Sequence, residues 1–258
     1  MKAFSRSMSR AKARRGFTLI ELIVVLMILV GLAGMVIPAV TDMVQRTHTS
    51  AAAGNIHEAT NAIARYEGQY LSFPDNLDSL KVAAAGVTTF VAAPGVPGIG
   101  GELATGTAVV DLTATEVNAL AAAGITSVRL HTIGATDDAT FQATGANAAV
   151  DATLDLLALT NTAAASLGLV SEANRYVVLG VGNRSQLIGR TMSEAPVHFP
   201  ENGDENPAAV YNRFLAVFDL GPVATRFERV KLAKVISPHV VSLDQEVGEY
   251  FEIINDNQ

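Results

Sequence analysis

The chain of 258 residues contains no cysteine and no tryptophan, and aromatic residues make up only 6% of it. The lack of cysteine excludes a disulfide and makes a zinc site unexpected. Exported domains of this size often carry a disulfide, so this one must be held together by packing or by a bound ion. Alanine, glycine and threonine are abundant between residues 82 and 169. The composition therefore predicts a core built from small side chains and loops.

Basic residues are scarce outside the amino-terminal end. The formal net charge is −7, yet the first sixteen residues carry six positive charges and no acid. These are Lys2, Arg6, Arg10, Lys12, Arg14 and Arg15. Without these six charges, the rest of the chain has a formal net charge of −13. Such an acidic chain lacks the clustered Lys and Arg that phosphate contacts require. We therefore expect no nucleic-acid partner. A basic run directly before an apolar segment is instead typical of the cytoplasmic flank of a membrane helix.

An uncharged apolar run extends from Leu22 to Val40. As a helix it would rise about 28 Å, close to the hydrocarbon thickness of about 30 Å in a bilayer. A cleaved signal peptide has a shorter apolar region, and its small-residue cleavage site follows that region. Here the small residue, Gly16, precedes the run, so cleavage after it would leave the anchor in place. Two glycines and Pro38 make the second half of this segment its weakest part.

One carboxylate, Glu21, lies at the beginning of the apolar segment, four residues after Phe17. A charged side chain at the middle of a bilayer costs roughly 3 kcal/mol. A buried carboxylate is tolerable when a cation satisfies it. Glu21 is therefore a candidate functional residue that needs a cationic partner. The alternative is that Glu21 lies at headgroup depth, in water.

The sequence RRGFTLIELIVVLMILVGLAGMVIPAV (residues 14–40) resembles the prepilin motif of type IV pilins and type II secretion pseudopilins. The resemblance implies that a prepilin peptidase cuts between Gly16 and Phe17 on the cytoplasmic side, and that the new amino terminus of Phe17 is N-methylated. Glu21 falls on the family's acidic position. Pro38 matches the proline at which the helix of many pilins bends or melts in the filament. In an assembled filament, the Glu21 carboxylate would meet the Phe17 amine of a neighbouring subunit.

The resemblance also implies a function and a location. We expect a structural subunit without enzymatic activity, anchored once in the inner membrane with its amino terminus cytoplasmic and its head periplasmic or, after assembly, extracellular. Its expected partners are copies of itself in a filament, minor pilin-like subunits, the prepilin peptidase, the inner-membrane assembly platform and lipid. Phe73-Pro74 and the missing cysteine pair favour the type II secretion pseudopilus over a type IV pilus. The alternative is a singly anchored exported binding or enzymatic domain that does not polymerise.

Beyond the membrane segment, the pattern predicts that the same helix continues. Residues at mostly three- or four-residue steps form one face. They are Val44, Thr47, Ala51, Ile56, Ala59, Ile63, Tyr66 and Tyr70. The predicted helix runs from about residue 17 to 71 and stops before Pro74, because a residue that precedes proline avoids the helical region. The predicted fold is α+β: a long amino-terminal membrane-spanning helix packed at its C-terminal half on a head with a small antiparallel sheet.

The predicted boundaries are a basic leader (1–16), a transmembrane and assembly helix (17–41), its amphipathic continuation (42–72) and an exported head (73–258). Residues 83–170 read as an insertion relative to compact pseudopilins. Within the head we expect helices at 75–86, 113–123 and 154–159, and strands at 128–133, 176–180, 214–219 and 251–254. The helix at 113–123 begins with the capping-box spacing of Thr113 and Glu116.

No motif for catalysis is complete in this chain. His57-Glu58 lacks the second histidine of a zinc-protease helix, and the chain has no P-loop and no G-x-S-x-G. The densest group of hard oxygens is the loop 201–206, which includes Asp204 and Glu205. Such a loop can bind calcium, and major pseudopilins of type II secretion use a calcium-bound loop in the head. The alternative is a solvated acidic loop, so we expect no cofactor and leave calcium at Asp204 and Glu205 open.

Overall fold

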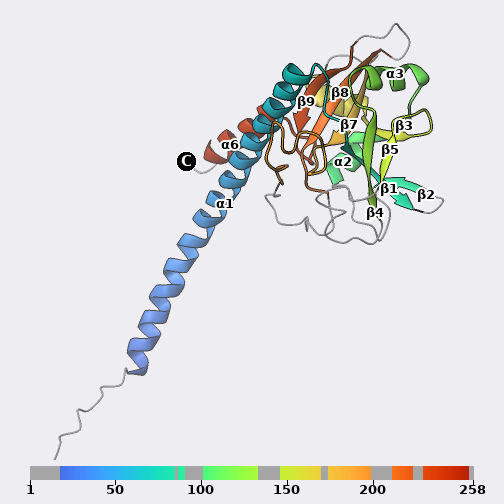
Figure 1. The fold of residues 1–258 in the computed structure, drawn as a ribbon. Helices are drawn as coiled ribbons and strands as arrows, with labels where there is room; N and C mark the ends of the chain where they lie inside the picture. Colours follow the sequence, from blue (N-terminus) through green and yellow to red (C-terminus); the bar gives the residue numbers. More distant parts are fainter. Residues whose placement is uncertain are drawn as a thin grey trace, which may run out of the picture. The chain divides into compact units, whose positions relative to one another are not determined.

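The computed structural model describes residues 18–84, 87–90, 101–132, 146–169, 174–198, 211–222 and 229–255. The chain divides into two compact units, residues 1–43 and residues 44–258. Helix α1 (Leu19–Tyr70) contributes its first part to the first unit and the rest to the second. Figure 1 traces the order of the elements. The two units are described separately below.

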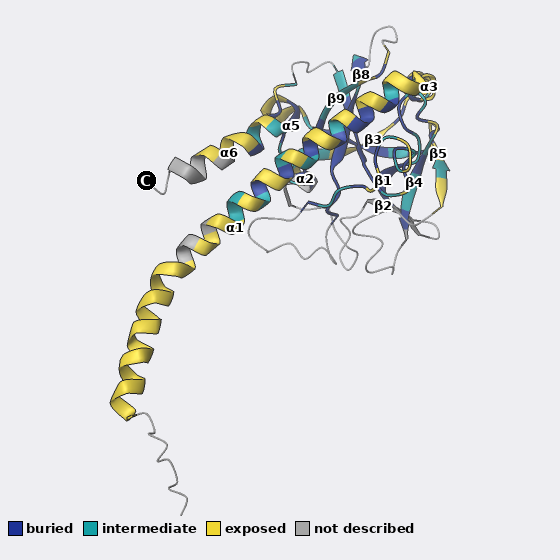
Figure 2. Cartoon of the chain, turned by 60° about the vertical axis from the view of Figure 1, so that its left-hand side comes forward, coloured by how far each residue is buried: buried dark blue, intermediate teal, exposed yellow. Residues whose placement is uncertain are grey.

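The first unit consists of the amino-terminal part of α1. Residues Leu19–Ile37 are long and apolar enough to cross a membrane, with a mean hydropathy of 2.8, and none of this window is buried. In Figure 2 this part of α1 is exposed on every side. The helix continues through Pro38 without interruption. A helix that is apolar all round needs a nonpolar environment, which lipid or the apolar helices of other subunits can supply.

In the second unit, one face of α1 is buried against the head. The buried face consists of Ala52, Ile56, Ala59, Ala62, Ile63 and Tyr66. The predicted packing of the C-terminal half of the helix on a head is thus confirmed. The predicted face was wrong at its two ends, because Val44, Thr47, Ala51 and Tyr70 are exposed. Thr49 and Ala52 are buried instead. The helix ends at Tyr70, and Leu71 takes a left-handed φ of 57°.

Among the described residues of the head, nine strands form one sheet. Its strands are β1 (Leu77–Ala84), β2 (Val87–Phe90), β3 (Thr107–Asp111), β4 (Ser127–Thr132), β5 (Asn147–Ala149), β6 (Asp155–Leu159), β7 (Asn174–Gly180), β8 (Leu215–Pro222) and β9 (Lys231–Ile236). They form two ladders, β3-β6-β7-β8-β9 and β2-β1-β4-β5, which the pair Asp78–Gly180 joins. The pair β1–β4 is parallel and the other paired strands are antiparallel.

Apolar side chains cover both faces of the central strands β7 and β8. Val177 and Phe218 belong to the core that includes the buried face of α1. Val178 and Val217 belong to a second core, together with residues of the short helices α2 (Gly101–Gly106) and α5 (Asn161–Ser166). Because successive side chains of a strand point to opposite faces, a strand buried on both sides reads as a continuous apolar run.

The α+β class is confirmed, as are the helix α3 (Ala114–Ala122) and the strands β4, β7 and β8. The sheet is larger than the small antiparallel one that we predicted, and one pair is parallel. The segment 83–170 supplies strands β2 to β6 to the common sheet.

Three predicted elements were wrong. The expected helix after Asp75 is strand β1, and the expected helix at 154–159 is strand β6. The expected strand at 251–254 belongs to helix α6 (Leu243–Asn255). The segment 154–159 is a short, mostly apolar run, whose periodicity does not distinguish a buried strand from a buried helix. Asp75 does not cap a helix, because its carboxylate accepts hydrogen bonds from the backbone N–H groups of Thr126 and Ser127.

Candidate functional site: the amino-terminal assembly segment

Glu21 is held by Thr18 at the first turn of α1. The backbone N–H and the hydroxyl of Thr18 donate hydrogen bonds to Glu21 Oε2 at 2.8 and 2.9 Å. In return, the backbone N–H of Glu21 donates to Thr18 Oγ1 at 3.4 Å. This is a capping box, in which the two residues satisfy groups that the first helical turn leaves unpaired. The carboxylate is thereby oriented toward the amino-terminal end of the helix.

Sequence reasoning identified Glu21 and missed Thr18. The signal was present, because Thr18 and Glu21 have the T-x-x-E spacing of a capping box before an apolar run. Between Thr18 and Thr41, Glu21 is the only charged residue. The neighbouring large side chains are exposed, for example Leu22 at 57% and Met35 at 79%. A single hydrogen-bonded carboxylate therefore lies at one end of a surface that is otherwise apolar.

Of the other predicted site residues, the structure describes Pro38 alone. Gly16 and Phe17 lie outside the described residues, as do Asp204 and Glu205. Calcium binding at Asp204 and Glu205 thus stays a prediction. Pro38 lies within α1. In the described part of the chain, no three His, Asp or Glu side chains are arranged to hold a metal ion.

In the second unit, an aromatic and cationic cluster attaches the irregular segment 181–198 to α1. The Tyr66 hydroxyl donates to Gln186 Oε1 at 2.6 Å, and Arg190 Nη1 donates to that hydroxyl at 2.8 Å. The Arg190 guanidinium also lies over the rings of Tyr66 and Tyr70, at 5.6 and 4.9 Å from their centroids. Burial raises the pKa of Tyr66, so its hydroxyl remains a neutral donor.

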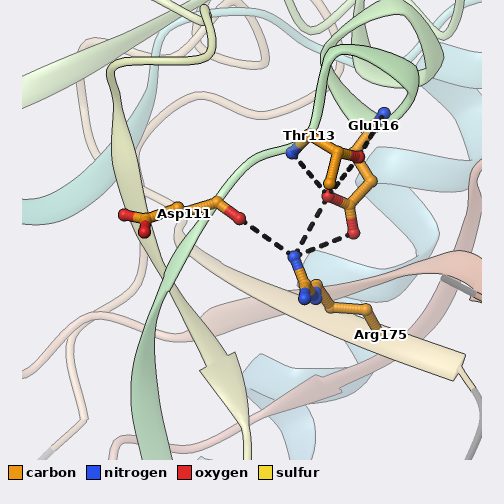
Figure 3. A network of polar contacts seen from close by, with 4 residues as sticks. All are labelled: Asp111, Thr113, Glu116 and Arg175. Carbon is orange, nitrogen blue, oxygen red and sulfur yellow. Dashed lines mark hydrogen bonds and ion pairs between the residues drawn. The ribbon is translucent and has the colours of Figure 1, made fainter.

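A buried ion pair attaches helix α3 to strands β3 and β7. Thr113 and Glu116 form the predicted capping box of α3, and Glu116 is only 6% exposed. Arg175 Nη1 lies 3.0 Å from the Glu116 carboxylate and donates to the Asp111 carbonyl at 3.0 Å. Figure 3 shows these four residues converging. The hydrogen bonds and the ion pair drawn there join residues of the head to one another, which is typical of a structural role.

The two ladders meet at a fully buried polar pair. Tyr211 donates its hydroxyl proton to Asp78 Oδ2 at 2.9 Å, and neither residue is exposed. Burial, followed by the charge of Asp78, raises the pKa of Tyr211 well above its ordinary value. Gly180 and Gly182 make room for this pair, because a Cβ atom at either position would collide with the Tyr211 hydroxyl or the Asp78 carboxylate. This hydrogen bond connects strand β1 to the segment that precedes β8.

Comparison with known proteins concerns the amino-terminal segment. A family model, the prokaryotic N-terminal methylation motif, matches residues 11–37. The chain carries the leader signature of type IV pilins and pseudopilins. Gly16, Phe17, Thr18 and Glu21 lie inside the matched segment of this pilin-type leader, and the head lies outside it. None of the curated proteins and none of the solved structures matches the chain.

A pilin-type leader followed by one apolar amino-terminal helix fits a protein anchored in the inner membrane. The α+β head, with a helix packed on a sheet, is consistent with a pilin-like fold. A pilin-type leader also implies a substrate of a prepilin peptidase and assembly into pilus-like filaments.

Proposed function

We propose that this protein is a structural subunit of a type IV pilus-like filament, and specifically of a type II secretion pseudopilus, that polymerises through α1. The observation that carries the proposal is the exposed apolar part of α1 with the Thr18–Glu21 capping box at its end. An apolar helix without a partner in its own chain is suited to pack against copies of itself. The carboxylate would then define the axial register between neighbouring subunits.

Cleavage after Gly16 would leave the capping box intact, because the amide that Thr18 donates belongs to the Phe17–Thr18 peptide bond. Cleavage would also create a cationic amine on Phe17. When a second subunit brings its own Phe17 amine close, the carboxylate that Thr18 has oriented gains an ionic partner in apolar surroundings. Deleting one partner of a buried ion pair costs about 3–5 kcal/mol, and such a cost would recur at every subunit contact.

The choice of a pseudopilus rests on two features of the head. The chain has no cysteine pair, and Phe73-Pro74 follows the end of α1 after two residues. Phe73 is 2% exposed and packs edge-on against Phe218, with ring centroids 5.2 Å apart. This contact connects the end of α1 to strand β8. In this proposal the amino terminus is cytoplasmic and the head periplasmic. The partners are the prepilin peptidase, the assembly platform and minor pilin-like subunits.

The alternative is an exported binding or enzymatic domain with one membrane anchor. It shares the leader and the anchor but predicts no filament. Peptidase-dependent shortening would occur in both cases, so it does not separate them. Polymerisation through α1 separates the two proposals. Only the filament subunit would need the carboxylate of Glu21 for assembly.

The test compares variants of the full chain produced with its assembly machinery. Glu21→Gln removes the charge and keeps the shape, so we expect normal membrane insertion and loss of long filaments from the sheared fraction. Glu21→Asp should be intermediate, because its carboxylate reaches less far. Thr18→Val should weaken assembly more than Thr18→Ser, which keeps the hydroxyl. Glu58→Gln is the matched control, since Glu58 is an exposed carboxylate in the second half of α1. Filaments as abundant with Glu21→Gln as with Glu58→Gln would refute the pairing mechanism, and the absence of any filament from the parent chain would favour the alternative.

A further inference from the structure

Lys81 is a buried lysine that faces a carboxylate on another strand. Its side chain, on β1, is 3% exposed, and its Nζ lies 3.3 Å from Oδ2 of Asp155 on β6. The Asp155 side chain is 29% exposed. Lysine is almost never buried unless it is paired. An amine and a carboxyl group in such contact, shielded from most of the solvent, can condense to form an amide bond.

A second carboxyl group lies beside this pair. Asp111 on β3 is directly opposite Asp155 in the antiparallel register of β3 and β6. The two carboxyl groups are hydrogen-bonded. This hydrogen bond and the charge of Asp155 raise the pKa of Asp111. Asp111 therefore binds a proton more readily than an isolated carboxyl group does, and it lies beside the carboxyl group that Lys81 contacts.

We propose that Lys81 and Asp155 form an intramolecular isopeptide bond, with Asp111 as the proton carrier. A proton passes from the Lys81 ammonium to the Asp155 carboxylate, which gives a neutral amine and a neutral acid. The amine nitrogen attacks Asp155 Cγ, and Asp111 takes the proton that the nitrogen then loses. Asp111 returns this proton to the departing hydroxyl group. The N–C bond forms, the C–O bond breaks and one water leaves, so no oxidant or other reactant is needed.

The position of this bond gives it a mechanical role. Lys81 belongs to the ladder β2-β1-β4-β5 and Asp155 to the ladder β3-β6-β7-β8-β9. Among the described strands, the only backbone pairing between the two ladders is Asp78–Gly180. Strand β1 is also the first strand after α1 along the chain. The cross-link would connect the ladders covalently in a chain that has no cysteine. It forms within one chain and does not depend on polymerisation.

Another lysine pair in the head serves as an internal control. Lys234 Nζ lies 3.6 Å from Asp244 Oδ2, but the two side chains are 27% and 87% exposed. Within the described residues, no carboxyl group is bonded to Asp244. The amine there stays hydrated, and no proton carrier is at hand. We expect this pair to remain ionic.

The cross-link has a clear signature in a tryptic digest of the full chain extracted from membranes. An acylated Lys81 resists trypsin, so the parent should yield peptide 66–129 joined to peptide 130–175, one water lighter than their sum. Without the bond, trypsin releases 66–81, 82–129 and 130–175. Free 66–81 as the main product from folded parent protein would overturn the proposal.

Variants test the chemistry separately from the fold. Lys81→Arg keeps an ion pair with Asp155 and should give unlinked peptides, as should Asp155→Ala. Asp155→Asn should still react, but with loss of ammonia, and should give a joined product identical in mass to that of the parent. Asp111→Ala should slow the reaction about 100-fold or more, because a positioned acid-base group contributes that much. Lys234→Arg should leave the joined peptide unchanged. A joined product that persists in Lys81→Arg would also refute the assignment.

Discussion

His198 is a buried base that the head holds in its neutral form. Its side chain is 5% exposed and its ring packs edge-on against Phe214, with centroids 5.8 Å apart. The ring of His239 lies 5.0 Å away. Burial, followed by the nearby charges of His239 and His48, lowers the pKa of His198 from 6.5 to about 4. Among the described residues, His198 Nδ1 has no hydrogen-bond acceptor beside it that would favour a proton there.

This shift makes the head less stable in acid. The unfolded chain binds a proton at His198 below pH 6.5, whereas the folded chain binds one only near pH 4, so stability falls as the pH decreases between these values. At about 1.4 kcal/mol per pKa unit, the loss from His198 reaches roughly 2 kcal/mol at pH 5 and about 3 kcal/mol at pH 4. Above pH 6.5, His198 is neutral in both the folded and the unfolded chain, so it does not change the free energy of unfolding.

The assay is urea unfolding of the full chain in detergent at a series of pH values. Near-UV circular dichroism reports on the head through its buried tyrosines, since the chain has no tryptophan. His198→Phe keeps an aromatic ring and cannot titrate, so we expect its stability to fall by about 2 kcal/mol less than that of the parent between pH 7 and 5. His57→Gln, a change at an exposed histidine of α1, should follow the parent. The reasoning is refuted if His198→Phe and the parent lose equal stability over this range.

Three further outcomes follow from the structure. Gly182→Ala places a methyl group against the buried Asp78 carboxylate, and we expect a loss of about 1–3 kcal/mol or failure to fold, whereas Gly68→Ala, with no atom nearby, should be tolerated; equal urea midpoints would contradict this. Glu116→Gln weakens a buried ion pair and the cap of α3, which should cost about 1–3 kcal/mol by urea unfolding and accelerate amide exchange in α3; unchanged exchange would show that the pair contributes little. Pro38→Ala restores a helical N–H donor and should leave membrane insertion unchanged but reduce filament yield; an unchanged yield would mean that Pro38 is a tolerated membrane proline.

The amino-terminal part of this protein was predictable because its signals are local. The apolar run after a basic flank indicates the anchor by length and composition, and Pro74 marks the end of the helix through a steric clash between adjacent residues. The capping box of α3 was likewise readable from the spacing of Thr113 and Glu116. Thr18 and Glu21 have the same spacing, and the capping box that they form in the structure is therefore also a local signal.

Local pattern failed where burial on both sides removed the alternation of polar and apolar residues. The segment 154–159 became strand β6 because β3 and β7 pair with it, and no property of those six residues requires this. The segment 251–254 reads as a strand by its aromatic and β-branched residues, yet it ends helix α6. For 154–159, the neighbours in space decided between two conformations that the local sequence allows.

The sequence by itself determined the leader, the anchor, the position of Glu21 and the α+β class, since each depends on composition or on residues within a few positions. Only the tertiary structure brought Tyr211 to Asp78, 133 residues away, and Lys81 to Asp155, 74 residues away. It also enclosed His198 among Phe214, His239 and His48. Such contacts depend on strand order and register, which arise from the joint packing of the whole head, and a one-residue change of register would turn these side chains to the opposite face of the sheet.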